Sequence, residues 1–293
     1  MLVTLLIAGL CLGCIYGLIG MGYSLVYKAS GQVNFMQGDA VTLGGYIGYT
    51  FYRILGIPFL PSLLITMVIM FGFGILVQRG IIATVMKRSA QPVLIIFTTT
   101  ALGMLLKAGF PIIWGAEAKT YGYLRFGGKE FAQIAGVNVA WSSIICLIVS
   151  AVFMICLHLF MNKTRFGTAL RAAAMDPMAA KSCGINVHFT TASVWGISCM
   201  IAAVCGMLVG PLYAILFMIG ANLGGKGFSS SVAGGFGNMY GAIIGGILVG
   251  IMETLIAGYI SSVYKDLFTY LLLLIVLFVM PRGIMNEKAV DEN

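Results

Sequence analysis

The chain has 293 residues, of which 60% are hydrophobic and 9% are charged, and its mean hydropathy is +1.02. A soluble domain carries about 25% charged residues, so this composition excludes an ordinary soluble enzyme. The net charge of +8 indicates basic loops on the cytoplasmic side of a membrane rather than nucleic-acid binding, because no nucleic-acid motif accompanies it.

The apolar runs are continuous rather than alternating, which favours membrane-spanning helices over a β-barrel. We predict an all-α, polytopic integral membrane helical bundle of about eight or nine transmembrane helices, forming one domain over residues 1–293 in the cell membrane. In chain order the expected spans are 2–27, 35–54, 60–78, 91–114, 138–161, 188–212, 232–257 and 266–281. The glycine-rich stretch 213–231 is expected to add a half-helix or re-entrant piece that helps an extra crossing, which leaves the tail with Arg282 and Lys288 on the cytoplasmic side.

Glycines recur four residues apart in two of these runs. They occupy Gly9, Gly13 and Gly17 in the first run, and Gly246 and Gly250 in a later one. Small residues at this helical spacing let two backbones approach closely in a membrane, so we predict close helix packing there.

Three polar residues, Asn34, Gln37 and Asp39, follow the first span at the cytoplasmic start of the second. Carboxylates are costly in a membrane and are usually placed for a reason. One hypothesis is that these residues line or hinge the cytoplasmic gate of a translocation path. The other is local: they hydrogen-bond the bend that follows Lys28.

Charge in the loops predicts the orientation of the bundle. Loops 79–90 and 162–187 have an excess of Lys and Arg and are expected in the cytoplasm. Loop 115–137 mixes both signs and is expected outside.

One basic, helix-forming patch interrupts the apolar chain: Thr164–Ile185, "TRFGTALRAAAMDPMAAKSCGI". Asp176 can cap a helix, Pro177 suits its first position, and Gly184 suits the residue after its end, so 177–183 is predicted to be a short helix. The helix formers of "GTALRAAAM" predict another before it. A small alanine surface with a basic rim is typical of a docking element, whereas the alternative is a basic loop that only sets orientation.

The segment 220–238 is unusually rich in glycine. "GANLGGKG" (220–227) has Lys226 at P-loop spacing, but Gly227 stands where a magnesium-binding Ser or Thr is required, so we expect no ATP site in this chain. "AGGFGN" (233–238) interrupts an apolar run and would either line the path or pack helices closely. Glu253 is expected to reach the membrane interface at the end of its span.

The patch Thr164–Ile185 resembles the cytoplasmic coupling segment of ABC importer permeases, and more narrowly the branched-chain amino-acid permease family of the LivH/LivM type. Three other stretches carry the same resemblance and follow in the expected order: 16–46 with its Asn-x-x-Gln-Gly-acid turn, 226–255 with its Gly-Gly-x-Gly segment, and "MPRGI" at 280–284, where the Pro and Arg of the family's ending are transposed.

The resemblance implies an assembly. A second, related permease subunit would complete the path, two cytoplasmic ATPase subunits would bind ATP and Mg²⁺, and an external binding protein would deliver the substrate. This chain would be neither an enzyme nor a metal or cofactor carrier. The residues assigned to ATPase coupling are Arg165, Gly167, Arg171, Ala172, Asp176, Pro177, Ala180 and Gly184. Those assigned to the translocation path are Asn34, Gln37, Asp39, Gly234, Gly235, Gly237 and Asn238.

Other functions stay open at this point. The same machine could carry urea, short amides or a sugar, since permease sequence reports substrate poorly. A gradient-driven secondary transporter or channel is the other class, but the alanine-rich helix pair has no use in a gradient-driven carrier.

Overall fold

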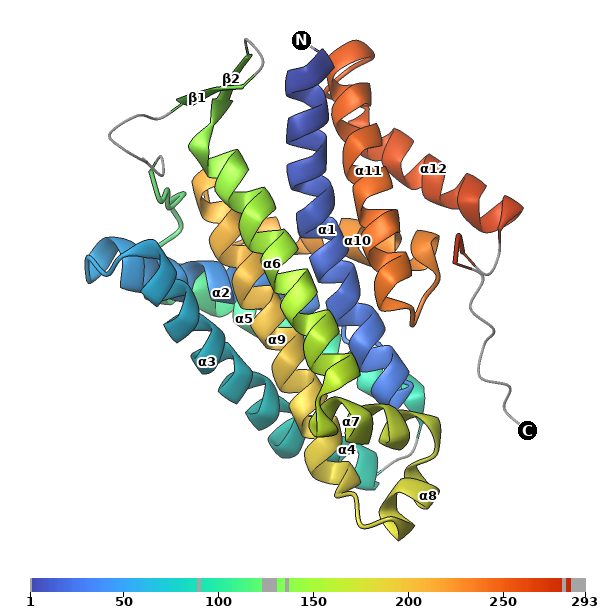
Figure 1. The fold of residues 1–293 in the computed structure, drawn as a ribbon. Helices are drawn as coiled ribbons and strands as arrows, with labels where there is room; N and C mark the ends of the chain where they lie inside the picture. The colour runs from blue at the N-terminus through green and yellow to red at the C-terminus, as the bar shows by residue number, and fades with distance from the viewer. Residues whose placement is uncertain (1, 89–90, 123–130, 135–136, 281–282, 286–293) are drawn as a thin grey trace.

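The computed structural model describes residues 2–88, 91–122, 131–134, 137–280 and 283–285, and helices make up nearly all of this part of the chain (Figure 1). The helices are α1 (Leu2–Ser30), α2 (Gln37–Tyr49), α3 (Phe59–Val77), α4 (Ala83–Arg88), α5 (Pro92–Trp114), α6 (Trp141–Lys163), α7 (Arg165–Met175), α8 (Pro177–Ser182), α9 (Val187–Leu212), α10 (Ile219–Gly234), α11 (Met239–Tyr259) and α12 (Lys265–Val279).

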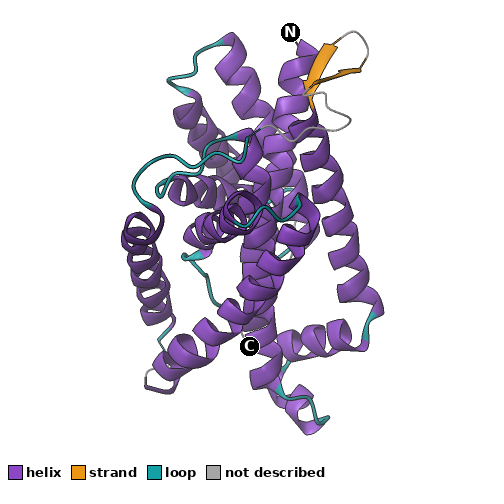
Figure 2. Ribbon diagram, turned by 90° about the vertical axis from the view of Figure 1, so that its left-hand side faces the viewer, coloured by secondary structure: helices purple, strands orange, loops and turns teal. Residues whose placement is uncertain are grey.

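Two π-helical turns, Thr50–Ile54 and Gln78–Ile82, follow α2 and α3 directly. The strands β1 (Phe131–Ile134) and β2 (Val137–Ala140) form a small antiparallel hairpin, with Phe131 opposite Ala140, at the end of the bundle where the N-terminus lies (Figure 2). Helices α4, α7 and α8 lie at the other end (Figure 1).

Six helices in the described part are long and apolar enough to cross a membrane: Leu2–Ser30, Phe59–Arg88, Val93–Trp114, Trp141–Lys163, Val187–Leu212 and Met239–Tyr259. The chain is therefore an all-α, multi-pass membrane protein. The predicted count of eight or nine crossings is not confirmed, because α2, α10 and α12 have 13, 16 and 15 residues. A perpendicular crossing needs about 20.

The predicted span 232–257 is corrected by the structure. It does not run through as one helix: α10 ends at Gly234, a turn follows, and α11 begins at Met239. Gly235 and Gly237 have φ of 114° and 96°, values that L side chains rarely adopt, so the chain can turn sharply here within an apolar run. Arg282 and Lys288, on which the predicted side of the C-terminus rests, lie outside the described residues, as does Pro281.

Helices α1 and α9 form the centre of the bundle. Nearly all of α9 is buried, from Thr190 to Gly210, and it packs against α1, α2 and α3. The buried residues of α1 run from Gly9 to Val26, and the part of the helix before Gly9 is more exposed. At the end of the bundle that carries α7 and α8, α1 and α9 contact α7, and α9 also contacts α8, so the two central helices position this segment.

A glycine seam joins α1 to α11, and it confirms the predicted packing of glycines four residues apart. A Cβ added to Gly13 would meet the backbone of Ile247, and one added to Gly246 or Gly250 would collide with the backbone of Gly17 or Gly13. The two helices therefore touch backbone to backbone over several turns. Helices α2 and α10 cross in the same way, with Gly38 against Gly220 and Gly224.

Candidate functional site

Helices α7 and α8 project from one end of the bundle between α6 and α9 (Figure 1). The Asp176 side chain caps α8, because its Oδ1 accepts from the backbone N–H groups of Met178 at 2.8 Å and Ala179 at 3.0 Å. After α8, Gly184 has a φ of 81° and Ile185 N donates to Ala180 O at 3.0 Å. The predicted pair of short helices with a bend at Asp176 is confirmed, and α8 is one residue shorter than predicted.

A second cap, which the sequence analysis did not identify, fixes the start of α7. Thr164 Oγ1 accepts from the backbone N–H of Gly167 at 3.0 Å. Gly167 is buried against the last turn of α6, and a Cβ there would collide with backbone carbonyls of that turn. The turn from α6 into α7 is therefore tight, and it sets the angle at which the coupling segment leaves the membrane.

Aromatic side chains hold α7 against the bundle. The Phe166 ring lies 5.9 Å from that of Phe160 on α6 and 6.0 Å from that of Phe189 on α9. The Arg79 guanidinium lies 5.7 Å from the Phe189 ring centroid. Leu170 is also buried, on the inner face of α7. Helix α7 is therefore packed against both α6 and α9, so a displacement of α7 would move its contacts with both helices.

The surface that α7 and α8 present to water differs from the predicted alanine surface. Ala180 is buried, and the large apolar side chains exposed here are Met175 and Met178, with 83% and 79% of their surface accessible; the smaller Pro177 and Ala179 are exposed as well. Neither methionine was singled out from the sequence: Met175 counted only among the helix formers of "GTALRAAAM", and Met178 was not considered. Which face of a short helix is exposed depends on its packing against the bundle, which the sequence of the segment does not report.

The coupling residues assigned from the sequence fall into two groups. Buried residues that shape the segment are Gly167 and Ala180, and Ala172 is partly buried. Exposed residues are Arg165, Arg171, Asp176, Pro177 and Gly184. Only the second group can touch a partner directly.

The structure buries Asn34 and Gln37 completely inside the chain. Gln37 Nε2 donates to the Ser198 carbonyl on α9 at 3.1 Å, and Ser198 Oγ donates to Gln37 Oε1 at 2.8 Å. Asn34 Oδ1 accepts from the backbone N–H of Met36 at 3.2 Å. The Asn34 contact is local, as one of the two hypotheses has it, whereas Gln37 fixes the start of α2 against the distant helix α9. The assignment of both residues to the translocation path stays a prediction.

Asp39 differs from its two neighbours. It lies between α2 and α5, where the absence of a side chain on Gly103 leaves room for the carboxylate. Its Oδ1 is buried and has no hydrogen-bond partner among the described residues. A buried acceptor without a partner is costly, so this is a place where a donor group from elsewhere would be stabilised.

The residues 234–238 form the junction of α10 and α11. A Cβ on Gly234 would collide with the Gly241 backbone, and Asn238 Oδ1 caps α11 by accepting from the N–H groups of Tyr240 at 2.9 Å and Gly241 at 3.2 Å. The structure thus shows packing and capping at Gly234 and Asn238. Their assignment to the translocation path stays a prediction.

A buried charge cluster joins three helices and was missed by sequence reasoning. Lys226 Nζ on α10 lies 2.6 Å from Glu253 Oε1 on α11 and 2.8 Å from Asp266 Oδ1 on α12. The Tyr16 hydroxyl on α1 donates to Glu253 Oε2 at 2.9 Å. The expectation that Glu253 reaches the interface is wrong, since only 3% of its surface is accessible. Lys226 is engaged here as part of a continuous helix, not as part of a phosphate loop.

The end that carries the hairpin has its own tie between loop and helix. Lys119 and Ile215 pair in an antiparallel bridge, and the Tyr121 hydroxyl donates to the Gly45 carbonyl of α2 at 2.7 Å. Burial, with a smaller effect of the neighbouring Tyr52, raises the pKa of Tyr121 well above its ordinary value. The Tyr121 hydroxyl therefore stays neutral and ties this loop to α2. Among the described residues, no group of three or more His, Cys, Asp or Glu side chains could hold a metal ion.

Comparison with known proteins gives a consistent result. Residues 5–277 match the profile of the family described as "Branched-chain amino acid transport system / permease component". The chain is 30% identical over 296 residues to the high-affinity branched-chain amino acid transport system permease protein LivH of Escherichia coli, with 97% of this chain and 95% of that protein covered. It is also 30% identical to the permease protein BraD of Pseudomonas aeruginosa, with 98% and 96% covered.

Among solved structures, the fold is similar to that of PsaBC from Streptococcus pneumoniae in complex with Fab. The TM-score is 0.53 at 14% sequence identity, and the match covers 95% of this chain and 91% of that one. At this identity the likeness concerns the fold alone.

Proposed function

The chain belongs to the family of branched-chain amino acid transport system permease components, and from that premise we propose that it imports branched-chain or similarly hydrophobic amino acids in an ATP-driven complex. Its place in the membrane follows from its six long apolar helices. The observation that carries the proposal is the conjunction of a full-length family match with a capped helix pair projecting from one end of the bundle.

The proposed complex contains a second, related permease, two cytoplasmic ATPase subunits that bind ATP and Mg²⁺, and an external binding protein. In this arrangement α7 and α8 seat on an ATPase subunit. Met175 and Met178 supply apolar contact area, and Arg165 and Arg171 supply a basic rim. Flexible methionine side chains adapt well to a partner's groove.

Coupling then follows from how α7 is anchored. Phe166 and Leu170 fix α7 to the ends of α6 and α9, so motion of the ATPase displaces these two helices together. Helix α9 in turn carries Ser198, which is bonded to Gln37 at the start of α2. The proposed path from the ATPase surface to the interior of the bundle thus runs through the Phe166–Phe189 contact, along α9, and across the Ser198–Gln37 hydrogen bond.

Asp39 is the residue that we assign to the translocation path. An amino acid in transit carries an ammonium group, and the Oδ1 atom of Asp39 offers an unpartnered acceptor between α2 and α5. Gly234, Gly235, Gly237 and Asn238 would shape and pack the junction of α10 and α11 rather than line the path.

The first prediction concerns the docking surface. Replacing Met178 by Glu puts a charge into the proposed apolar contact. We expect leucine uptake and ATPase activity stimulated by the binding protein to fall about tenfold, as for loss of one contact residue that dominates an interface. Membrane insertion should not change, because Met178 touches little of the bundle. Uptake by the reconstituted complex and copurification of the ATPase are the measurements.

The control is Met178→Leu, which keeps an apolar side chain of similar size at the same exposed position. It should leave uptake and copurification unchanged. Equal behaviour of the two variants would remove the docking assignment. Uptake of urea in preference to leucine by the unmodified complex would instead remove the substrate assignment and leave the docking surface standing.

A further inference from the structure

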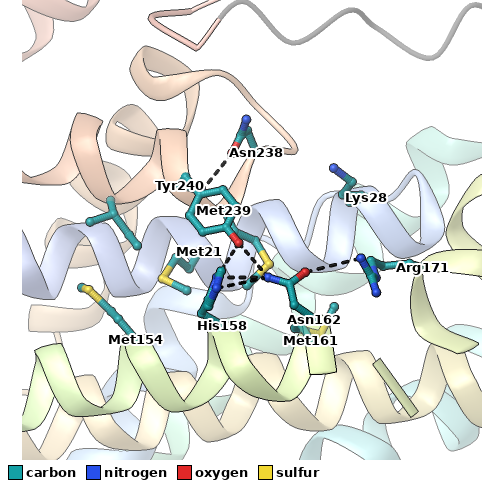
Figure 3. Close-up of a pocket in the computed structure, with 11 residues that line it drawn as sticks. Met21, Lys28, Met154, His158, Met161, Asn162, Arg171, Asn238, Met239 and Tyr240 are labelled. Carbon is teal, nitrogen blue, oxygen red and sulfur yellow. Dashed lines mark hydrogen bonds between the residues drawn. The ribbon is translucent and has the colours of Figure 1, made fainter. Parts of the chain in front are cut away.

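A pocket of about 290 Å³ opens between α1, α6, α7 and α11, near the end of the bundle where the coupling segment lies (Figure 3). Its lining divides by chemistry. Methionines from three helices and one isoleucine give it an apolar floor, namely Met21, Met154, Met161, Met239 and Ile243. Two cationic side chains, Lys28 from the end of α1 and Arg171 from α7, line the same end of the pocket, and Met21 and Met154 lie toward the other (Figure 3).

A polar chain crosses the pocket and fixes the position of Arg171. The Tyr240 hydroxyl on α11 lies 2.6 Å from His158 Nδ1 and 3.0 Å from Asn162 Nδ2, both on α6. Arg171 Nη1 donates to Asn162 Oδ1 at 3.4 Å. This contact uses one of the five N–H groups of the guanidinium, so the side chain is held in place and keeps donors for a second acceptor.

This combination defines the ligand by its chemistry. A lysine and an arginine that line one end of a pocket attract a phosphate group, and an apolar floor of adaptable methionines accepts hydrocarbon. The pocket lies where membrane-spanning helices meet a basic, water-facing segment, which is the depth of lipid head groups. A free phosphate ion would use the cations but leave the floor exposed to water. A neutral hydrophobic molecule would use the floor but not the cations.

We propose that this pocket binds one anionic phospholipid, with the phosphate between Lys28 and Arg171 and the upper part of an acyl chain on the methionine floor. The lipid joins α1 and α11 to the coupling helix α7. The site is independent of the transported substrate. It rests on the proposed function for the placement of α7 at the cytoplasmic face and shares Arg171 with the proposed docking rim, so the test uses Lys28.

The test measures lipid bound to the purified complex by native mass spectrometry in detergent. Phosphatidylglycerol and phosphatidylcholine with the same acyl chains are titrated in parallel, and phosphatidylglycerol should be retained more tightly. In Lys28→Gln the affinity for phosphatidylglycerol should fall about fivefold, the effect of about 1 kcal/mol for one basic residue near a membrane surface. Phosphatidylcholine binding should stay unchanged.

Lys163→Gln is the matched control. Lys163 is an exposed lysine at the end of α6, close to this pocket but not part of its lining. It should bind phosphatidylglycerol as the unmodified complex does. Glycerol 3-phosphate and inorganic phosphate, which carry the charge without acyl chains, should not displace the lipid at millimolar concentration.

Three results would overturn the proposal: equal retention of the two lipids, equal loss in Lys28→Gln and Lys163→Gln, or displacement by inorganic phosphate. The last would identify a free-anion site. None of these results bears on leucine uptake, so the proposed function and the lipid site fail separately.

Discussion

The buried carboxylate of Glu253 contacts a lysine, a tyrosine hydroxyl and a second, more distant lysine. Lys226 Nζ lies 2.6 Å from its Oε1, Lys265 Nζ lies 3.8 Å from the same atom, and the Tyr16 hydroxyl lies 2.9 Å from Oε2. Removing one partner from a buried ion pair leaves the other charge uncompensated, which costs more than the pair itself contributes. Glu253 is therefore the residue whose loss is hardest to compensate within this cluster.

We predict that Glu253→Gln lowers the stability of the chain by about 3–5 kcal/mol, the cost of breaking a buried pair. Asp266→Asn should cost much less, because 53% of the Asp266 side chain is accessible and water can replace it. Thermal unfolding in detergent, monitored by size-exclusion chromatography, gives the unfolding midpoint of each variant, and the midpoint of Glu253→Gln should be the lower. Similar midpoints for the two variants would show that Glu253 is not the central member.

Sequence reasoning could not find this cluster. Lys226 and Glu253 are separated by 27 residues on two different helices, and Tyr16 lies far earlier in the chain. No periodicity relates residues on different helices, so their contact depends on how α1, α10 and α11 pack. Asp176 and Gly184 were predictable for the opposite reason, because a cap depends on two or three neighbours in sequence.

At the scale of elements, the junction of α10 and α11 is the main departure from expectation. Hydropathy marked 232–257 as one span because the turn residues are small and not polar enough to interrupt the run. The break comes from positive φ at Gly235 and Gly237, which composition does not report. The close contact of Gly234 with Gly241 then folds the two helices back onto each other.

Gly234→Leu tests whether this junction packs or lines the path. The added side chain would collide with the Gly241 backbone, so we expect less folded complex, at a cost of about 1–3 kcal/mol or more. Uptake per assembled complex should be unchanged. Gly72→Leu on α3 is the control, because a Cβ there meets nothing within 4 Å. Normal yield with reduced uptake per complex would support the path assignment instead.

For the whole molecule, the loop charges predict which end faces the cytoplasm, and a native residue can report it. Cys183 is exposed next to the C-terminal end of α8. Cys156 is also exposed but lies within the apolar helix α6, where an aqueous reagent does not reach it, Cys14 is half-buried, and the other four cysteines, Cys11, Cys146, Cys199 and Cys205, are buried. Ser89, in the other basic loop, lies outside the described residues. Positive charge near α8 and its distance from the hairpin end both favour a cytoplasmic Cys183.

We predict that a membrane-impermeant maleimide labels Cys183 only after intact cells are permeabilised. Cys183→Ser should abolish this labelling. An added cysteine in Glu117→Cys, at an exposed position near the hairpin end, should be labelled from outside without permeabilisation. Labelling of Cys183 in intact cells would reverse the orientation and remove the ATPase docking surface with it.

The glycine seam between α1 and α11 limits which missense mutations the gene can tolerate. Every missense change at a glycine codon gives a residue with a Cβ, and at Gly13, Gly246 and Gly250 that atom would meet backbone on the facing helix. Backbone cannot rotate aside as a side chain can. Missense alleles at these codons should therefore be depleted from any library selected for growth on the transported amino acid, whereas Gly72 and Gly80, where a Cβ meets nothing within 4 Å, should accept small residues freely.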